Sequence, residues 1–179
     1  DLPPHKEVRR RRAEGPLPGE TERVKKVYVA SSWRNAAQLV VVWYLRRRGY
    51  EVYDFREPGP GGSGFRWSEI DPEWANWTPE AFREGLKHPI AQAGFERDRA
   101  ALAACDICVL VMPCGRSAHL EAGWAAGAGK PVVVLLAEGE PELMYLLTAR
   151  LVTSMEELRA SLEGLACGDS MELPRRPLR

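Results

Sequence analysis

The 179-residue chain has no net charge and no long apolar run. Lys and Arg together number 25, as do Asp and Glu, so the overall charge does not indicate nucleic-acid binding. Residues 1–26 carry eight Lys or Arg against five Asp or Glu, and residues 171–179 carry three against one. The body between these basic ends is therefore net acidic, which argues against a nucleic-acid groove. No apolar run reaches the roughly 18 residues that cross a bilayer.

Cysteine is scarce, and the common nucleotide fingerprints are missing. Of four cysteines, Cys105 and Cys108 have C-x-x-C spacing, but Cys108 lies inside an apolar run and no second Cys/His pair follows at a suitable distance. We therefore expect reduced core thiols rather than a metal site. Neither G-x-G-x-x-G nor a Walker motif is present. The first residues show no signal-peptide pattern, so we expect a cytoplasmic protein that binds neither nucleic acid nor membrane.

Short apolar runs alternate with helical stretches along the chain. The pattern predicts strands at residues 27–30, 50–55, 107–112, 131–136 and 151–153, and helices at 36–48, 79–86, 90–104, 119–128 and 154–165. Unbroken apolar runs are typical of strands buried on both faces of a parallel sheet. Regular alternation of strands and helices therefore predicts an α/β fold, a parallel sheet with helices on both faces.

We place this domain at residues 25–166, with a tail at each end and one insert within it. Residues 1–24 are rich in Pro, Gly and Arg and are expected to form a mobile basic tail, although the Arg9–Arg12 run could bind an anion. Residues 167–179 form a second tail. Residues 56–80 are a Gly- and Pro-punctuated aromatic insert that holds three of the six tryptophans.

Small polar and basic residues follow two of the predicted strands. Ligands of parallel α/β sheets bind at the carboxyl ends of the strands, which directs attention to loops 31–35, 56–80 and 113–121. Hydroxyls and arginines before a helix suit a phosphate or a ribose. The candidate binding residues are Ser31, Ser32, Arg34 and Asn35 in the first loop, and Gly115, Arg116 and Ser117 in the third.

Two carboxylates are candidates for chemistry at a sugar. Glu121 is expected in the first turn of a helix capped near Ser117, where the helix dipole favours an ionised carboxylate. Such a group can attack an anomeric carbon, or it can merely complement the dipole. Asp98 could supply the second carboxylate that glycosidic cleavage uses, or it could be a solvated helix charge. Spacing alone favours the ordinary interpretation for both residues.

Other side chains near these loops have two interpretations. His119 could be a general acid or a packing residue at a helix start. The tryptophans Trp67, Trp74 and Trp77 could stack on a nucleobase or close over it as a mobile lid. They could equally form a satellite hydrophobic cluster that holds the insert together.

Three parts of the chain together bear a family resemblance. The residues A-S-S-W-R-N at 30–35, a helix with Asp98, and D-I-C-V-L-V-M-P-C-G-R-S-A-H-L-E-A-G-W-A-A-G-A-G-K-P-V-V-V-L at 106–135 resemble the nucleoside 2-deoxyribosyltransferase superfamily. That group includes the nucleoside 5'-monophosphate N-glycosidases. The resemblance covers residues 27–165 in outline, and its specific part is 98–136. It implies that Glu121 is the nucleophile and Asp98 the partner that handles the base.

The departures from the family pattern are also informative. Members that act on free nucleosides carry an Asp six residues before the nucleophile, where this chain has Gly115. A carboxylate there would repel a phosphate, whereas Gly with free backbone N–H groups would not, which favours a nucleotide substrate. The insert at 56–80 is longer than is usual in the family. The segment 140–145, where relatives often complete a neighbouring subunit's site, has acidic residues and no Asn or Ser.

Together these features predict a flavodoxin- or Rossmann-like domain of about five parallel strands, forming a homodimer. The predicted activity is cleavage of the N-glycosidic bond of a nucleoside 5'-monophosphate, with no metal or organic cofactor. Three alternatives stay open: transfer of the sugar to a second base, hydrolysis of NAD by a TIR-like enzyme, and a non-catalytic nucleotide sensor.

Overall fold

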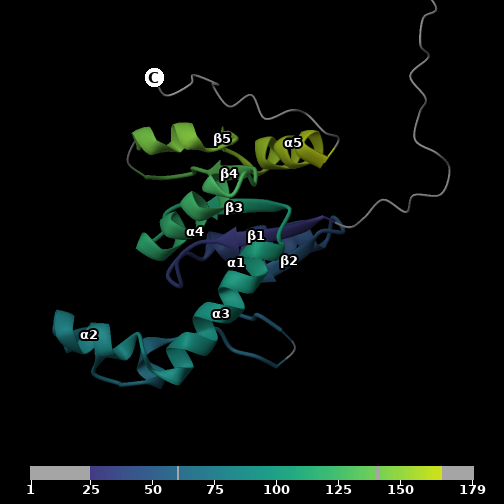
Figure 1. Ribbon diagram of the computed structural model, residues 1–179. Helices are drawn as coiled ribbons and strands as arrows, with labels where there is room; N and C mark the ends of the chain where they lie inside the picture. Colours follow the sequence, from purple (N-terminus) through teal and green to yellow (C-terminus); the bar gives the residue numbers. More distant parts are fainter. Residues whose placement is uncertain (1–24, 60, 140–141, 167–179) are drawn as a thin grey trace, which may run out of the picture.

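Five strands form the centre of the molecule (Figure 1), whose computed structural model describes residues 25–59, 61–139 and 142–166. The two tails expected from the sequence lie outside these residues. The strands are β1 (Lys26–Ala30), β2 (Glu51–Asp54), β3 (Ile107–Val111), β4 (Val132–Leu135) and β5 (Arg150–Val152). The α-helices are α1 (Ala37–Arg46), α2 (Pro79–Gly85), α3 (Pro89–Ala104), α4 (Arg116–Gly127) and α5 (Met155–Ala166). None of the described helices is long and apolar enough to cross a membrane.

The sheet is entirely parallel, with strand order β2-β1-β3-β4-β5. This confirms the predicted α/β, Rossmann-like fold. The chain leaves β1 in one direction to form β2 at the edge and returns to form β3 on the other side of β1. The order therefore reverses between β1 and β3, and the carboxyl ends of these two strands border the crevice where such sheets bind ligands.

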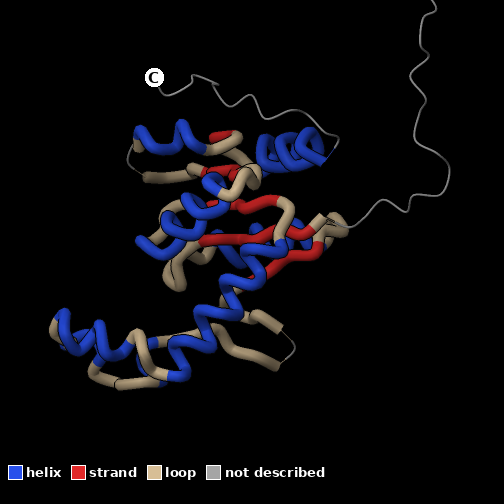
Figure 2. Tube along the Cα trace, in the orientation of Figure 1, coloured by secondary structure: helices blue, strands red, loops and turns tan. Residues whose placement is uncertain are grey.

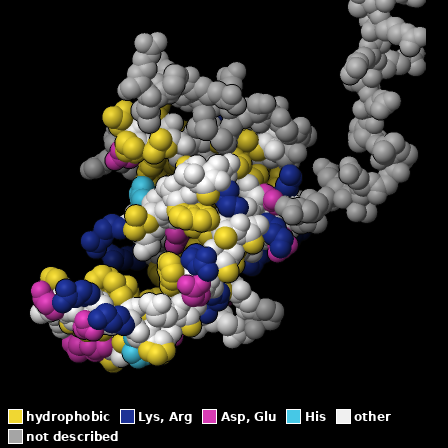
Figure 3. Space-filling model, viewed as in Figure 1, with side chains coloured by type: hydrophobic (Ala, Val, Ile, Leu, Met, Phe, Trp, Pro, Cys, Tyr) yellow, Lys and Arg dark blue, Asp and Glu magenta, His cyan; other side chains and the backbone are white. Residues whose placement is uncertain are grey.

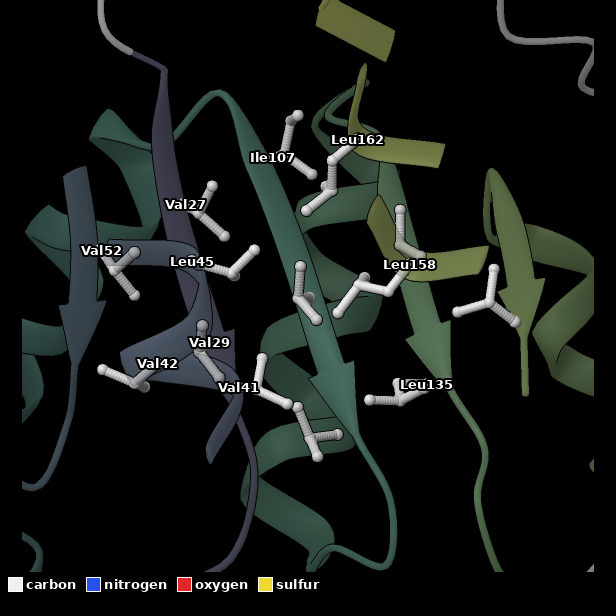
Figure 4. Packing of buried hydrophobic residues seen from close by; sticks show 14 residues of the cluster. Val27, Val29, Val41, Val42, Leu45, Val52, Ile107, Leu135, Leu158 and Leu162 are labelled. Atoms are coloured by element: carbon white, nitrogen blue, oxygen red, sulfur yellow. The ribbon is translucent and has the colours of Figure 1, made fainter. Parts of the chain in front are cut away.

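The sheet is covered on both faces because its central strands β1, β3 and β4 are buried at every position except Lys26. Alternate residues point to opposite faces. Val27, Val29 and Val109 lie on one face, where α1 and α5 cover them with Leu45, Leu158 and other aliphatic side chains (Figure 4). On the other face, Tyr28, Cys108 and Leu110 pack under α3 and α4. Alanines supply much of the buried face of α4, so this helix lies close to the sheet.

Most predicted boundaries are confirmed to within two residues. Gly49 and Gly129 follow α1 and α4 with φ of +84° and +77°, a conformation that glycine adopts at helix ends without strain. One boundary is wrong: α4 begins at Arg116, with Gly115 as its N-cap, rather than at residue 119. The sequence also did not predict the 3-10 helices η1 (Trp67–Glu69), η2 (Trp74–Asn76) and η3 (Leu143–Leu147).

Residues 65–88, here called the insert lobe, project away from the sheet. The aromatic insert and α2 lie beside the first half of α3, whose second half lies over the sheet (Figures 1 and 2). Phe65 joins the insert to this helix at Gly94: a Cβ built on that glycine would lie 2.9 Å from Phe65 Cβ. The contact requires glycine because any larger side chain would overlap the Phe65 side chain at its root.

Gly94→Ala should therefore destabilise the protein even though alanine is the better helix former. We expect a loss of about 1–3 kcal/mol in the free energy of unfolding from overpacking. The matched control is Gly123→Ala in α4, where nothing lies within 4 Å of the added Cβ. That variant should be as stable as the wild type or gain up to about 1 kcal/mol. Chemical denaturation of both variants checks this, and equal stabilities would contradict the packing described.

Candidate active site

Two half-buried carboxylates meet over the sheet. Asp98 lies in the second half of α3 and Glu121 in α4, and these two helices cover the same face. Burial and, to a smaller extent, the charge of Asp98 together raise the pKa of Glu121 to about 7. Burial also raises the pKa of Asp98. Both carboxylates act on the same buried tyrosine, Tyr28, and Asp98 accepts a hydrogen bond from Tyr53, whose ring stacks on Tyr28. The two carboxylates therefore border one site.

The protonation state of Glu121 differs from the sequence expectation. Since α4 begins at Arg116, Glu121 lies in the second turn, and the first turn holds no acidic residue. The helix dipole acts mainly within the first turn, so burial outweighs it. With a pKa of about 7, Glu121 is protonated in about half of the molecules at neutral pH. The expected fully ionised, dipole-stabilised carboxylate is therefore wrong for the unliganded protein.

Two tyrosines that the sequence analysis missed lie beneath the carboxylates. Tyr28 on β1 and Tyr53 on β2 are register partners, and their rings stack with centroids 5.2 Å apart and planes 19° apart. The Tyr53 hydroxyl donates a hydrogen bond to Asp98 Oδ1 at 2.6 Å. A tyrosine within an otherwise aliphatic buried strand was the available signal, because a buried hydroxyl normally has a polar partner nearby.

The hydroxyl of Tyr28 faces Glu121 without a well-formed hydrogen bond. Tyr28 is fully buried, and its hydroxyl holds the pKa of Glu121 down against the effect of burial. The contact does not reach full hydrogen-bond geometry, and among the described residues the hydroxyl has no other partner. An unpaired buried donor is costly, so Tyr28 is placed to bond to Glu121 when that carboxylate ionises.

Ser31 and Asn35 tie the loop after β1 to the loop after β3. Ser31 Oγ donates to the carbonyl oxygen of Val111 at 2.8 Å. Asn35 Nδ2 donates to the carbonyl of Pro113 at 3.0 Å, and its Oδ1 accepts from the N–H of Ala37 at 2.9 Å. These side chains thus fix the start of α4 relative to β1, and their role as direct substrate ligands stays a prediction.

Arg56, which the sequence analysis also missed, holds the rest of the first loop. Its Nη2 donates to the carbonyl oxygens of Ser32, Trp33 and Asn35 at 2.9–3.0 Å. The Ser32 hydroxyl accepts from the N–H of Arg34 at 3.2 Å, and the Arg34 side chain is exposed. Arg56 therefore fixes the backbone of this loop and leaves Arg34 accessible.

The N-terminus of α4 is exposed at the same edge of the sheet. Gly115, Arg116 and Ser117 are all accessible, and nothing lies within 4 Å of a Cβ built on Gly115. Free N–H groups at a helix start, together with an arginine and a hydroxyl, can bind an anion. The structure thus places the predicted phosphate-binding residues of this loop at the start of the helix that carries Glu121.

His119 is held between this helix start and η3. Its Nδ1 lies 3.1 Å from the Gly115 carbonyl, and its Nε2 lies 3.0 Å from the Tyr145 hydroxyl. Since a carbonyl only accepts, Nδ1 carries a proton, and the Tyr145 hydroxyl lies between Nε2 and Sδ of Met112, to which it donates at 3.3 Å. The two rings also stack with planes 6° apart. This packing accounts for His119 without a substrate, so its predicted substrate-binding role stays a prediction.

The tryptophans of the insert lobe contact one another. Trp67 has T-shaped contacts with Phe65 at 4.8 Å, Trp77 at 5.7 Å and Phe82 at 5.3 Å. The indole of Trp77 covers Gly85 of α2. Trp74 is 43% exposed. These contacts account for Trp67 and Trp77 as a satellite cluster, and the predicted lid and base-binding roles of the three tryptophans remain untested.

The surface is hollowed between the insert lobe and the sheet body (Figure 3). Lys or Arg side chains border this hollow on the body side, where α4 lies in Figure 1. A separate hollow of about 340 Å³ lies between α1 and the chain after β2, lined by Trp43, Arg46, Asp54 and other residues, and contains no candidate site residue. The candidate active site is therefore defined by the carboxylate pair on α3 and α4 and by the exposed start of α4.

The cysteines do not add a metal site to the described part of the chain. Cys105 and Cys108 are buried, as predicted, and Cys114 is half-buried; none of the three forms a disulfide within the described residues. Burial, followed by the charge of Glu121, raises the pKa of Cys114 to about 11. Cys114 is therefore a neutral thiol at physiological pH. Within the described residues, no group of three or more His, Cys, Asp or Glu side chains could hold a metal ion.

The chain matches no protein-family model and no curated protein sequence, but solved structures resemble it. One is a 2-deoxyribosyltransferase from Bacillus psychrosaccharolyticus, with 22% identity and a TM-score of 0.48 over 74% of this chain and 89% of that one. Another is the CMP N-glycosidase BcmB from Clostridium botulinum, with 18% identity and a TM-score of 0.44 over 78% and 98%. Both are enzymes of the kinds named by the sequence resemblance.

Glu121→Gln should change how stability depends on pH. A pKa raised from 4.5 to about 7 stabilises the folded protein below pH 4.5, and this contribution is lost as the pH rises through 7. Gln does not ionise, so the variant does not lose stability in this way as the pH rises. The variant should therefore gain stability relative to the wild type between pH 4.5 and 7, by about 3 kcal/mol at most, and the difference should then stay level.

Urea denaturation at half-unit pH steps measures this difference. Glu163→Gln is the control, because Glu163 is exposed on α5 and paired with Arg159. A stability difference for Glu121→Gln that does not change with pH would show that Glu121 is not a buried carboxyl with a raised pKa.

Proposed function

We propose that this protein hydrolyses the N-glycosidic bond of a nucleoside 5'-monophosphate through a glycosyl-enzyme intermediate. The observation that carries the proposal is the pair of half-buried carboxylates, Glu121 and Asp98, on the two helices that cover one face of the sheet. Two carboxylates are sufficient for both steps of a retaining cleavage. The motif around Glu121 supports the same assignment.

In the first step, the ionised carboxylate of Glu121 attacks C1' of the sugar. The C1'–N bond breaks, and its electron pair moves to the base, which Asp98 protonates or orients. In the second step, Asp98, now ionised, takes a proton from a water molecule whose oxygen attacks C1', and the bond between C1' and the Glu121 oxygen breaks to restore the carboxylate. The products are the free base and a sugar 5-phosphate, and no step needs a cofactor.

Tyr28 supports the ionised form of the nucleophile. Its buried hydroxyl lies next to Glu121 and has no other partner among the described residues. Because Glu121 is close to half ionised at neutral pH, a small change in its surroundings is enough to populate the reactive state. Exclusion of water by the substrate would by itself oppose ionisation, and the Tyr28 hydroxyl is placed to offset this cost.

The start of α4 supports a 5'-phosphate as part of the substrate. Gly115 leaves room and free N–H groups where a carboxylate would repel the anion. Arg116 and Ser117 follow in the first turn, and the exposed Arg34 comes from the neighbouring loop after β1. We assign phosphate binding to these residues, because they lie at the carboxyl edge on the same helix as the nucleophile.

The alternatives differ in what accepts the sugar or in whether a reaction occurs. Transfer would require a second base in place of water at the glycosyl-enzyme stage. Hydrolysis of NAD would require room for a second phosphate and adenosine. A nucleotide sensor has no need for a buried carboxylate pair, which is costly to keep, so Glu121 and Asp98 favour catalysis.

The homodimer expected from the sequence also stays a prediction. Large apolar side chains are exposed on η3 and α4, among them Leu143 at 74% and Leu120 at 76%. Such surface is common at contacts between protein chains. It lies near Tyr145 and His119, so a second copy bound there would border the candidate site.

Glu121→Gln should abolish base release while the fold survives. The substitution keeps the shape of the side chain but removes the attacking charge, so kcat should fall at least about a thousandfold. The assay incubates the protein with each common nucleoside monophosphate, and with NAD, and measures free base by chromatography. Glu163→Gln is the control and should keep full activity. If Glu121→Gln retained more than about a tenth of the activity, Glu121 would not be the nucleophile.

A 5'-phosphate should raise kcat/KM by at least about tenfold over the free nucleoside, because its loss leaves charged donors without a partner. Arg116→Gln should weaken this preference with little change in the rate for the nucleoside. Measuring kcat/KM for each nucleotide and its matching nucleoside, in the wild type and in Arg116→Gln, gives this preference. Equal rates would favour a nucleoside enzyme, and added free base that gains the sugar would identify a transferase.

A further inference from the structure

The bond between Tyr53 and Asp98 has no place in the two-step scheme above. We propose that Tyr53 is a positioning residue, whose hydroxyl holds Oδ1 of Asp98 and so directs the other carboxylate oxygen, Oδ2, toward the departing base. This inference rests on the proposed function for the identity of the base. The orientation and charge of Asp98, however, can be measured without any substrate.

The position of the Tyr53 hydroxyl is fixed from two sides. Tyr53 is on β2, where backbone pairing sets it opposite Tyr28, and the stacked rings limit its rotation. Its hydroxyl meets Asp98 Oδ1 at 2.6 Å, which is within the range of charge-assisted hydrogen bonds to a carboxylate. The Asp98 carboxylate, on helix α3, is thus oriented by a residue of the sheet as well as by its own helix.

The groups around Asp98 explain why it needs this partner. Tyr53 on β2 donates to it, Tyr28 on β1 and Glu121 on α4 lie beside it, and Arg97 precedes it on α3. Burial raises the pKa of Asp98, whereas the Tyr53 hydrogen bond and the charge of Arg97 lower it. Without Tyr53, this half-buried carboxylate would lose the hydrogen bond that the tyrosine donates and would hold its proton more tightly.

Tyr53 therefore also affects which carboxylate holds a shared proton. While Tyr53 stabilises the anion of Asp98, that negative charge favours a proton on Glu121. The reaction needs the opposite arrangement, with Glu121 ionised and the proton on Asp98. Because Oδ1 is engaged by Tyr53, the proton is carried on Oδ2, and transfer breaks the Oδ2–H bond as the N–H bond of the base forms. Tyr53 thus makes Oδ2 of Asp98 the oxygen that donates the proton to the base.

Tyr53→Phe tests the proposal because it removes only the hydroxyl and keeps the ring stacked on Tyr28. Carboxyl ¹³C NMR over a pH series follows Asp98, whose signal is assigned with Asp98→Asn. We expect the pKa of Asp98 to rise by about one unit in Tyr53→Phe, since the anion loses a donor. Tyr44→Phe also removes one hydroxyl, but from a tyrosine that packs on the opposite face of the sheet, so it should leave the Asp98 titration unchanged.

Kinetics on the same proteins show whether the orientation matters for the reaction. With a nucleoside 5'-monophosphate, Tyr53→Phe should lower kcat about tenfold or more while KM stays within about twofold, and its pH–rate profile should move with the Asp98 titration. Tyr44→Phe should match the wild type. A variant with normal kcat and an unmoved profile would show that the bond is merely structural.

The two measurements separate the two proposals. An Asp98 titration that is the same in Tyr53→Phe and in the wild type overturns the role of Tyr53, whatever the activity. A wild-type protein that releases no base from any nucleotide overturns the proposed function, and the NMR titration still decides whether Tyr53 sets the state of Asp98.

Discussion

Repulsion between two partly desolvated carboxylates is the constraint around which the site is built. Asp98 and Glu121 come from helices that cover the same face of the sheet, and each would be more stable if the other were neutral or absent. Such an arrangement is costly and persists only where the surrounding structure holds it in place. Here the two tyrosines of the sheet stand beneath the pair and offer hydroxyls, one to Asp98 and one toward Glu121.

The backbone near the pair is held by side chains that were first taken for substrate ligands. Ser31 and Asn35 join the end of β1 to the loop that leads into α4, and Arg56 holds the carbonyl groups of the loop between. These bonds fix the start of α4 and hence the position of Glu121. Residues at strand ends therefore have a structural role in the site whether or not they also contact a substrate.

Packing within the insert lobe explains why this segment is rich in tryptophan. Trp67 and Trp77 pack against each other, and Trp77 also lies against Gly85 of α2. Their packing fixes a lobe that borders the hollow opposite α4 (Figure 3). The lobe can therefore shape one wall of the candidate site through its position, and an individual indole need not contact the base for it to do so.

The sequence by itself determined the sheet, its parallel direction, the helix positions and the two carboxylates, because these follow from local apolar periodicity and from one short motif. It could not determine the first residue of α4, since Ser117 and Gly115 are both acceptable helix caps, and tertiary packing decided between them. Nor could it determine the charge of Glu121, because desolvation arises only when α3 and α4 lie on the sheet. The pairing of Tyr53 with Asp98 joins residues 45 positions apart, so only the folded chain could reveal it.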